Sequence, residues 1–226
     1  DDEDVRRETK LVSAMATTSS GSDDEDDIEG QQVLDQPAHT LVVNRLRKVY
    51  DDTTVAVSDL SFRVAKGECF GLLGANGAGK SSTISAIIRA VEPTHGDIFV
   101  EGHSVLDNFE VAATALGVVA QSNTLWNNLT CANHLELFAK IRGVPDEHAP
   151  ELVDAALDQL ELRPHADKLA TSLSGGMKRK LCVAIAIIGD PQCVLLDEPS
   201  AGLDPVARRN LWNLLRRTMS PRAVVL

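Results

Sequence analysis

Residues 69–81 read CFGLLGANGAGKS, an apolar run that passes into a glycine-rich turn and then into a helix expected over residues 80–90. The turn fits the phosphate-loop pattern G-x-x-x-x-G-K-[ST], and strand, turn and helix follow in the order that this loop requires. Glycines let backbone N–H groups close around phosphates, Lys80 neutralises the β and γ groups, and the Ser81 hydroxyl reaches Mg²⁺. The candidate nucleotide-binding residues are Gly74, Asn76, Gly77, Gly79, Lys80, Ser81 and Ser82.

A second apolar strand ends in two carboxylates. Residues 193–198 read CVLLDE, which is the arrangement of a Walker B motif. Asp197 would hold Mg²⁺ through water, and Glu198 would polarise the attacking water as general base. Glu198 and Lys80 are therefore candidate catalytic residues, and Asp197 joins Ser81 as a candidate metal ligand.

A second glycine-rich helix start lies at residues 173–178, LSGGMK. Two glycines after a serine leave the backbone N–H groups at the start of a helix accessible and without hydrogen-bond partners. The helix dipole also favours an anion there. We therefore expect Ser174, Gly175 and Gly176 to hold a phosphate. The basic run at residues 178–180 is interpreted as a solvated helix face rather than a nucleic-acid site.

The negative charge of the chain is concentrated in a leader. Residues 1–40 hold 12 acidic and 3 basic residues, so they contribute −9 to the net charge of −11. This segment has too little apolar surface to offset its ordering entropy, and we expect a disordered linker rather than a specific docking element. The remaining residues, 41–226, suit one domain. Their low aromatic content and the lack of a basic excess argue against nucleic acid as a partner.

The four cysteines show no paired metal-ligand spacing, and three of them lie in apolar runs. Buried free thiols in a reducing compartment are therefore expected. The longest apolar runs are far below the roughly 20 residues that a bilayer span needs. Any membrane connection must come from sequence outside this chain.

Apolar patterning predicts an α/β fold. The expected antiparallel edge sheet contains strands at residues 41–46 and 55–64, and the apolar run 69–73 is expected to be a short buried strand. Further strands are expected at 98–100, 116–120, 193–196 and 223–226, further helices at 176–188 and 205–217, and a helical insertion at 129–172. Alternating strands and helices imply a mostly parallel sheet that binds its ligand at the carboxyl ends of its strands.

With these motifs the chain resembles the nucleotide-binding domain of ABC ATPases over residues 41–226. Within that superfamily it is most similar to the A subfamily, which is associated with lipid transport. The residues that carry the finer match are 67–74, 128–130 with His134 and Leu135, 174–180, and 204–209 with Leu211 and Trp212. The resemblance implies a P-loop NTPase core that binds ATP and Mg²⁺, with an antiparallel edge sheet and a helical signature subdomain at about residues 122–180.

The resemblance also implies roles for single residues. Tyr50 would stack on adenine, and Gln121 would act in catalysis by touching Mg²⁺ and the attacking water. Asp204 ends the segment 200–204, which would cross a dimer interface to the nucleotide. In this family two domains pair head to tail, so the helix start at 174–176 would serve the γ-phosphate of the partner domain's ATP.

One departure from the family pattern concerns the C-terminus. The family has a switch histidine a few residues beyond the strand that ends this chain at Leu226, and none of the six histidines occupies that position. We therefore expect a domain that is incomplete at its C-terminus and that hydrolyses ATP poorly by itself.

Two functions from different classes are compatible with these motifs. The first is a transport ATPase at the cytosolic face of a membrane, whose partners are a second nucleotide-binding domain and the transmembrane domains of the same transporter, with lipids as cargo. The alternative is a soluble ABC ATPase that acts in translation or DNA remodelling. It predicts a strongly basic surface or a tandem copy of the domain, and the nearly neutral residues 41–226 do not support the first of these. A domain that binds ATP without turnover is disfavoured because Lys80 and Glu198 are both present.

Overall fold

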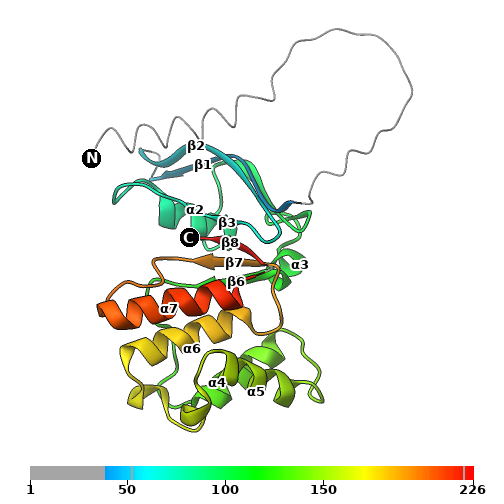
Figure 1. The fold of residues 1–226 in the computed structure, drawn as a ribbon. Helices are drawn as coiled ribbons and strands as arrows, with labels where there is room; N and C mark the ends of the chain where they lie inside the picture. The colour runs from blue at the N-terminus through cyan, green and yellow to red at the C-terminus, as the bar shows by residue number, and fades with distance from the viewer. Residues whose placement is uncertain (1–38, 52, 221) are drawn as a thin grey trace.

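The computed structural model describes residues 39–51, 53–220 and 222–226 (Figure 1). The linker expected at residues 1–40 lies outside the described residues except for His39 and Thr40. These two residues belong to the first strand, where His39 pairs with Ala65 and Thr40 is 2% exposed. The first strand therefore begins two residues before the expected boundary of the linker, because its pairing with the neighbouring strand extends to His39.

An antiparallel sheet forms one layer, in the order β2-β1-β4-β5. Its strands are β1 (His39–Tyr50), β2 (Thr54–Ala65), β4 (His95–Val100) and β5 (His103–Ser104). The strand expected at 41–46 is present but continues well beyond its expected end. The register of β1 shifts between Val43 and Leu46, where Arg45 has a positive φ of 50°. Such an irregularity breaks the apolar alternation that marks a strand in the sequence.

A parallel sheet forms the second layer, in the order β3-β8-β7-β6. Its strands are β3 (Cys69–Phe70), β8 (Ala223–Val225), β7 (Cys193–Leu196) and β6 (Leu116–Val119). Alternate side chains of β7 enter two different cores, as the two-residue period of a strand requires. Cys193 and Leu195 join the core shared with the antiparallel sheet, whereas Val194 and Leu196 join the core shared with the helices. The predicted parallel sheet with an antiparallel edge sheet is therefore confirmed.

The prediction of a buried strand at residues 69–73 is wrong in both length and burial. Only Cys69 and Phe70 form β3, Cys69 is exposed, and Leu73 is 79% exposed. Among the described strands, β3 pairs only with β8, so it lies at the edge of the parallel sheet. The sequence could not reveal this because an apolar run does not distinguish an edge strand from a central one.

The four cysteines differ in burial, as the edge and central strands do. Cys131, Cys182 and Cys193 are buried free thiols as expected, whereas Cys69 on the edge strand is exposed. Burial raises the pKa of the Cys193 thiol to about 12. Cys193 therefore behaves as a small apolar residue of the central strand.

Helices cover the parallel sheet on both faces (Figure 1). On the side of the antiparallel sheet lie α2 (Lys80–Ile87) and α3 (Phe109–Thr114). The opposite face is covered by α6 (Gly175–Ile187) and α7 (Pro205–Thr218). Beyond α6 lie α4 (Cys131–Ile141), α5 (Ala149–Gln159) and two 3-10 turns, Arg163–His165 and Ala170–Ser172, which confirm the predicted helical insertion.

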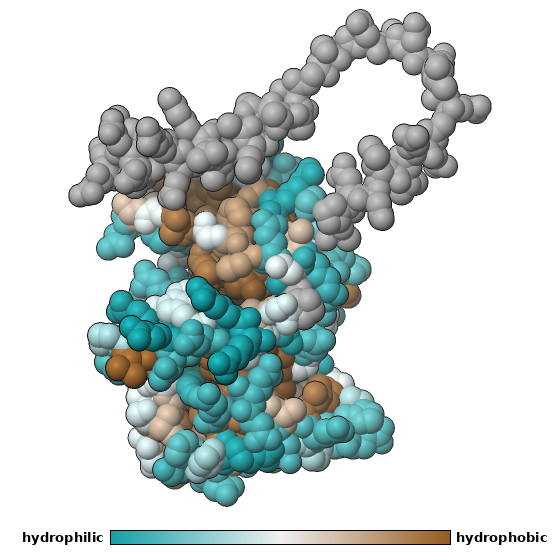
Figure 2. Space-filling view, viewed as in Figure 1, coloured by the Kyte–Doolittle hydropathy of each residue, from teal (hydrophilic) through white to brown (hydrophobic). Residues whose placement is uncertain are grey.

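The surface differs between these layers. On the face drawn in Figure 2, apolar side chains gather around β2, α2 and β3, while polar side chains cover α6 and α7. Within the described part of the chain, no helix has the length and apolar character needed to span a bilayer.

Candidate active site

The phosphate loop joins β3 to α2, and its glycines are required by its shape. Gly77 and Gly79 have φ values of 85° and 87°, in the left-handed region that glycine adopts readily. A Cβ atom at Gly79 would lie 2.2 Å from the carbonyl oxygen of Ala56 on β2. The loop is therefore closed against the antiparallel sheet, and only glycine fits at its last turn.

The Lys80 ammonium group lies over this loop. Its Nζ donates hydrogen bonds to the carbonyl oxygens of Gly74 at 2.6 Å and Ala75 at 3.0 Å. The loop ends at Gly79, which caps α2 without a side-chain hydrogen bond, so the first N–H groups of α2 have no side-chain partner at the cap. A cation and a helix start at the same loop make a binding place for phosphate.

Asp197 and Ser81 meet beside the loop. The Ser81 hydroxyl donates to Oδ2 of Asp197 at 3.5 Å, although the two residues are 116 positions apart in the chain. Both groups offer oxygen atoms, and Mg²⁺ is bound in such enzymes by one or two protein oxygens with phosphates and water completing its shell. This donor set fits Mg²⁺ bound with a nucleotide.

Glu198 and Gln121 form the second pair of the site. Gln121 follows β6 and Glu198 follows β7. Nε2 of Gln121 donates a hydrogen bond to Oε2 of Glu198 at 2.9 Å. Both side chains are exposed. Glu198 has a φ of 44°, a conformation that costs a non-glycine residue roughly 1–2 kcal/mol. Neighbouring contacts must therefore hold this backbone in place.

Those contacts come from Arg179, whose role was not predicted from the sequence. Arg179 lies on α6 and is 2% exposed, so the interpretation of residues 178–180 as a solvated face is wrong at this position. Its guanidinium donates to backbone carbonyls of the segments that follow β6 and β7, namely those of Ala120, Gln121, Asp197, Glu198 and Pro199. Helical spacing offered a signal, because Arg179 precedes the buried residues Cys182 and Val183 by three and four positions.

The neighbouring Lys180 is also not a free solvated charge. Its Nζ pairs with Oε2 of Glu161 at 2.5 Å, and its side chain is 19% exposed. The hydrogen bond from Lys180 lowers the pKa of Glu161. The basic run thus connects α6 to the helical region and to the catalytic segments.

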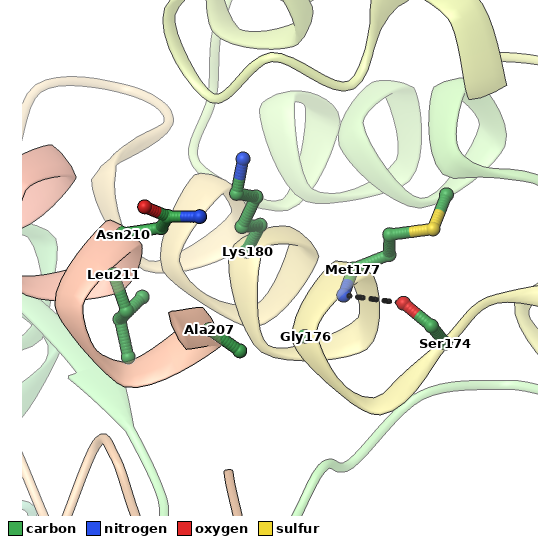
Figure 3. Close-up of a pocket in the computed structure, with 7 residues that line it drawn as sticks. All are labelled: Ser174, Gly176, Met177, Lys180, Ala207, Asn210 and Leu211. Atoms are coloured by element: carbon green, nitrogen blue, oxygen red, sulfur yellow. Dashed lines mark hydrogen bonds between the residues drawn. The ribbon is translucent and has the colours of Figure 1, made fainter. Parts of the chain in front are cut away.

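The second glycine-rich helix start lies at α6, on the other face of the parallel sheet from α2 (Figure 1). Ser174 is the N-cap, and its hydroxyl accepts from the N–H of Met177 at 3.3 Å. A cavity of about 180 Å³ adjoins this helix start, and its lining residues are Ser174, Gly176, Met177, Lys180, Ala207, Asn210 and Leu211. Figure 3 shows that the cavity lies between the first turns of α6 and α7.

Two further predicted residues have clear positions. Tyr50 ends β1, and the Lys48 ammonium lies 4.8 Å from the centre of its ring. Asp204 is the N-cap of α7, where its Oδ1 accepts from the N–H groups of Val206 at 2.9 Å and Ala207 at 3.0 Å. The stacking role of Tyr50 and the interface role of Asp204 stay predictions, because no described contact bears on either.

The site combines a phosphate loop, a hydroxyl paired with a carboxylate, and a glutamate beside a glutamine at the end of a parallel sheet. This combination defines an ATP-binding domain of the P-loop type. The model of the ABC transporter family matches residues 57–201. The chain therefore belongs to the ABC transporter family, as the resemblance predicted.

Curated relatives carry the match to the A subfamily. The chain is 45% identical over 201 residues to ATP-binding cassette sub-family A member 2 of Rattus norvegicus, covering 84% of this chain and 8% of that protein. It is 42% identical over 196 residues to the phospholipid-transporting ATPase ABCA3 of Homo sapiens, covering 85% of this chain and 12% of that protein. The chain thus spans about a tenth of the length of these relatives.

Solved structures agree with the fold. A structure described as the ATP binding subunit of an ABC transporter has a TM-score of 0.73 and 29% identity, covering 83% of this chain and 78% of that one. The predicted fold class, a P-loop core with parallel and antiparallel sheets and a helical region, is therefore confirmed.

Proposed function

We propose that this chain binds Mg²⁺ and ATP and hydrolyses the ATP to drive transmembrane transport, with lipids as the cargo. The observation that carries this proposal is that two hydrogen-bonded pairs share the segment that follows β7. The Ser81 hydroxyl on α2 lies 3.5 Å from Oδ2 of Asp197, and Nε2 of Gln121 lies 2.9 Å from Oε2 of Glu198. Gln121 follows β6 and the two carboxylates follow β7, so they lie at the carboxyl ends of neighbouring parallel strands. Ligands of open α/β sheets bind at these ends.

Each residue has a chemical task in this proposal. Lys80 leaves its loop carbonyls to bind the β- and γ-phosphates, supported by Gly74, Asn76, Gly77, Gly79 and Ser82 around the loop. Ser81 and Asp197 hold Mg²⁺, which neutralises the phosphate charge when bound. Glu198 accepts a proton from the attacking water, and Gln121 orients that water and contacts the metal. Tyr50 stacks on adenine.

A second copy of such a domain is the proposed partner. Gly175 and Gly176 have ordinary φ values, and a Cβ atom at Gly175 would meet nothing within 4 Å. The fold of this chain therefore does not require glycine at these positions, whereas close approach of an outside phosphate does. We propose that the partner's ATP docks on Ser174, Gly175 and Gly176, with Asp204 near the interface and ATP driving the head-to-tail pairing.

Lipid cargo and membrane location rest on relatives. The name of one relative describes a phospholipid-transporting ATPase, and we extend this chemistry to the protein that contains the present chain. The domain would then lie at the cytosolic face of a membrane and pass its motion to transmembrane domains through Gln121 and the helical region.

Glu198→Gln tests the hydrolytic step in the intact protein. The amide cannot accept a proton as a carboxylate does, so we expect ATP turnover to fall by at least roughly 100-fold. ATP binding, followed with a fluorescent analogue, should stay within about twofold. Glu110→Gln on the exposed face of α3 is the matched control and should leave both unchanged. Unchanged turnover in Glu198→Gln would show that Glu198 is not the base.

Lipid transport is tested by the same pair of variants. The intact protein is reconstituted into vesicles that contain a labelled phospholipid, and ATP-dependent movement of the label between leaflets is recorded. Glu198→Gln should abolish this movement and Glu110→Gln should retain it. ATP turnover without any movement of phospholipid would contradict the assignment of lipid cargo and leave the hydrolytic proposal intact.

A further inference from the structure

The Arg179 side chain makes an unusual set of contacts. Its Nε donates to the carbonyl of Pro199 at 2.6 Å, its Nη1 to those of Ala120 at 2.6 Å and Gln121 at 3.3 Å, and its Nη2 to those of Asp197 and Glu198 at 3.2 Å each. All three nitrogen atoms are used, and every acceptor is a backbone oxygen.

These acceptors belong to two segments only. One leaves the end of β6 and carries Gln121, and the other leaves the end of β7 and carries Asp197 and Glu198. The two segments lie side by side because β6 and β7 are paired in parallel register. One guanidinium group from α6 therefore ties together the two backbones that carry the metal ligand, the glutamate and the glutamine.

Packing alone does not account for this residue. Arg179 is 2% exposed, and its burial lowers the pKa of the guanidinium, because a cation loses its hydration there. An apolar side chain would fill the space without that cost. The planar guanidinium has five N–H groups in fixed directions, whereas a lysine ammonium is a single point of charge, so lysine cannot reproduce the five contacts.

We propose that Arg179 is a positioning residue for ATP hydrolysis, which sets the separation and orientation of Gln121 and Glu198 by clamping their backbones. This inference rests on the proposed hydrolytic function. Arg179 holds the left-handed backbone of Glu198 so that the Glu198 carboxylate faces Gln121. A displaced backbone would turn this carboxylate away from the attacking water. Arg179 itself touches neither ATP nor water.

Arg179→Lys in the intact protein tests the proposal. We expect kcat for ATP turnover to fall by roughly 10- to 100-fold, since small displacements of catalytic groups cost that much. The KM for ATP should stay within about twofold, because Lys80 and the phosphate loop are untouched. Turnover is expressed per molecule that binds a fluorescent ATP analogue, so that partial unfolding does not imitate a loss of kcat.

Arg142→Lys is the matched control. Arg142 is also partly buried with a pKa lowered by burial, and its Nη1 donates to the carbonyls of Ala113 at 3.0 Å and Thr114 at 3.4 Å at the end of α3. It makes the same kind of contact away from the catalytic segments. Arg142→Lys should therefore keep kcat, even where it lowers the melting temperature as much as Arg179→Lys.

The positioning role and the proposed function are overturned by different results. A kcat for Arg179→Lys equal to that of the unchanged protein, while Glu198→Gln is inactive, overturns the positioning role alone. Full activity of Glu198→Gln would show instead that Glu198 is not the base, and absence of ATP turnover in the unchanged protein would overturn the proposed function. If Arg179→Lys does not bind the ATP analogue, Arg179→Gln is measured in the same way. Loss of ATP binding in both variants would show a purely structural role for Arg179 and would overturn the positioning role.

Discussion

Two glycine-rich helix starts, one at α2 and one at α6, look alike in the sequence but differ in what their glycines do. At α2, Gly79 has a φ of 87°, and a Cβ atom there would lie 2.2 Å from the Ala56 carbonyl. At α6, Gly175 has open space around its Cβ position and Gly176 would meet only the Ala207 Cβ at 3.6 Å. The chain's own fold thus explains the first glycine and leaves the second pair unexplained.

The two helix starts also differ in the groups that lie beside them. The α2 start has its lysine, its carboxylate and its hydroxyl beside it within one chain. The α6 start has a serine cap and a cavity shared with α7. Its glycines meet no close neighbour within the chain, which agrees with the proposal that a second domain completes this site.

The largest effect is expected for Gly79→Ala. The added methyl group collides with the Ala56 carbonyl, and alanine resists the left-handed conformation, so we expect a loss of at least about 2 kcal/mol in the free energy of unfolding. Binding of a fluorescent ATP analogue should be lost. Gly71→Ala, where a Cβ atom would meet nothing within 4 Å, is the control and should keep the melting temperature. ATP binding by Gly79→Ala would contradict a loop closed against β2.

Gly175→Ala should separate stability from activity. Alanine favours a helix over glycine, so the free energy of unfolding should be unchanged or raised by up to about 1 kcal/mol. The added methyl group would occupy the space proposed for the partner's phosphate, and turnover should fall by roughly 10-fold or more. Both quantities are measured on the intact protein by thermal unfolding and phosphate release. Normal turnover would remove the reason for assigning a partner to this helix start.

The smallest effect concerns the serine hydroxyl groups at the two helix starts. Ser174→Ala removes the acceptor for the Met177 N–H and should cost about 1 kcal/mol in the free energy of unfolding. Ser81→Ala should cost less, because α2 has no side-chain cap and the Ser81 contact to Asp197 is 3.5 Å long. Thermal or denaturant unfolding compares the two variants. A larger loss for Ser81→Ala would mean that the α2 start depends on this hydroxyl for its fold.

Several features could be predicted because they follow from neighbours in the chain. The turn at 74–81 needs glycines next to a lysine, and the strand at 193–196 is buried throughout, so local patterns placed both. The helical insertion also followed from its spacing. The edge position of β3 and the long β1 could not be predicted, since strand order and the irregularity at Arg45 depend on segments far away in the chain.

Arg179 is the sharpest failure of local interpretation. A run of three basic residues usually faces solvent, yet the middle one lies under the catalytic segments and the last pairs with Glu161. The carbonyls that accept its hydrogen bonds lie 58 and 59 residues before it and 18 to 20 residues after it. No pattern within the run announces these distant partners.

Local sequence was enough to identify the phosphate loop, the two carboxylates after β7, the glycine-rich start of α6 and the alternation of strands and helices, because each depends on conformational preferences over a few residues. Which of these groups meet depends on the tertiary structure. It brought Ser81 to Asp197, Gln121 to Glu198 and Arg179 to the backbones of both loops. The physical reason is that parallel strands distant in sequence place their carboxyl ends side by side, so contacts across them depend on sheet order and helix packing rather than on local sequence.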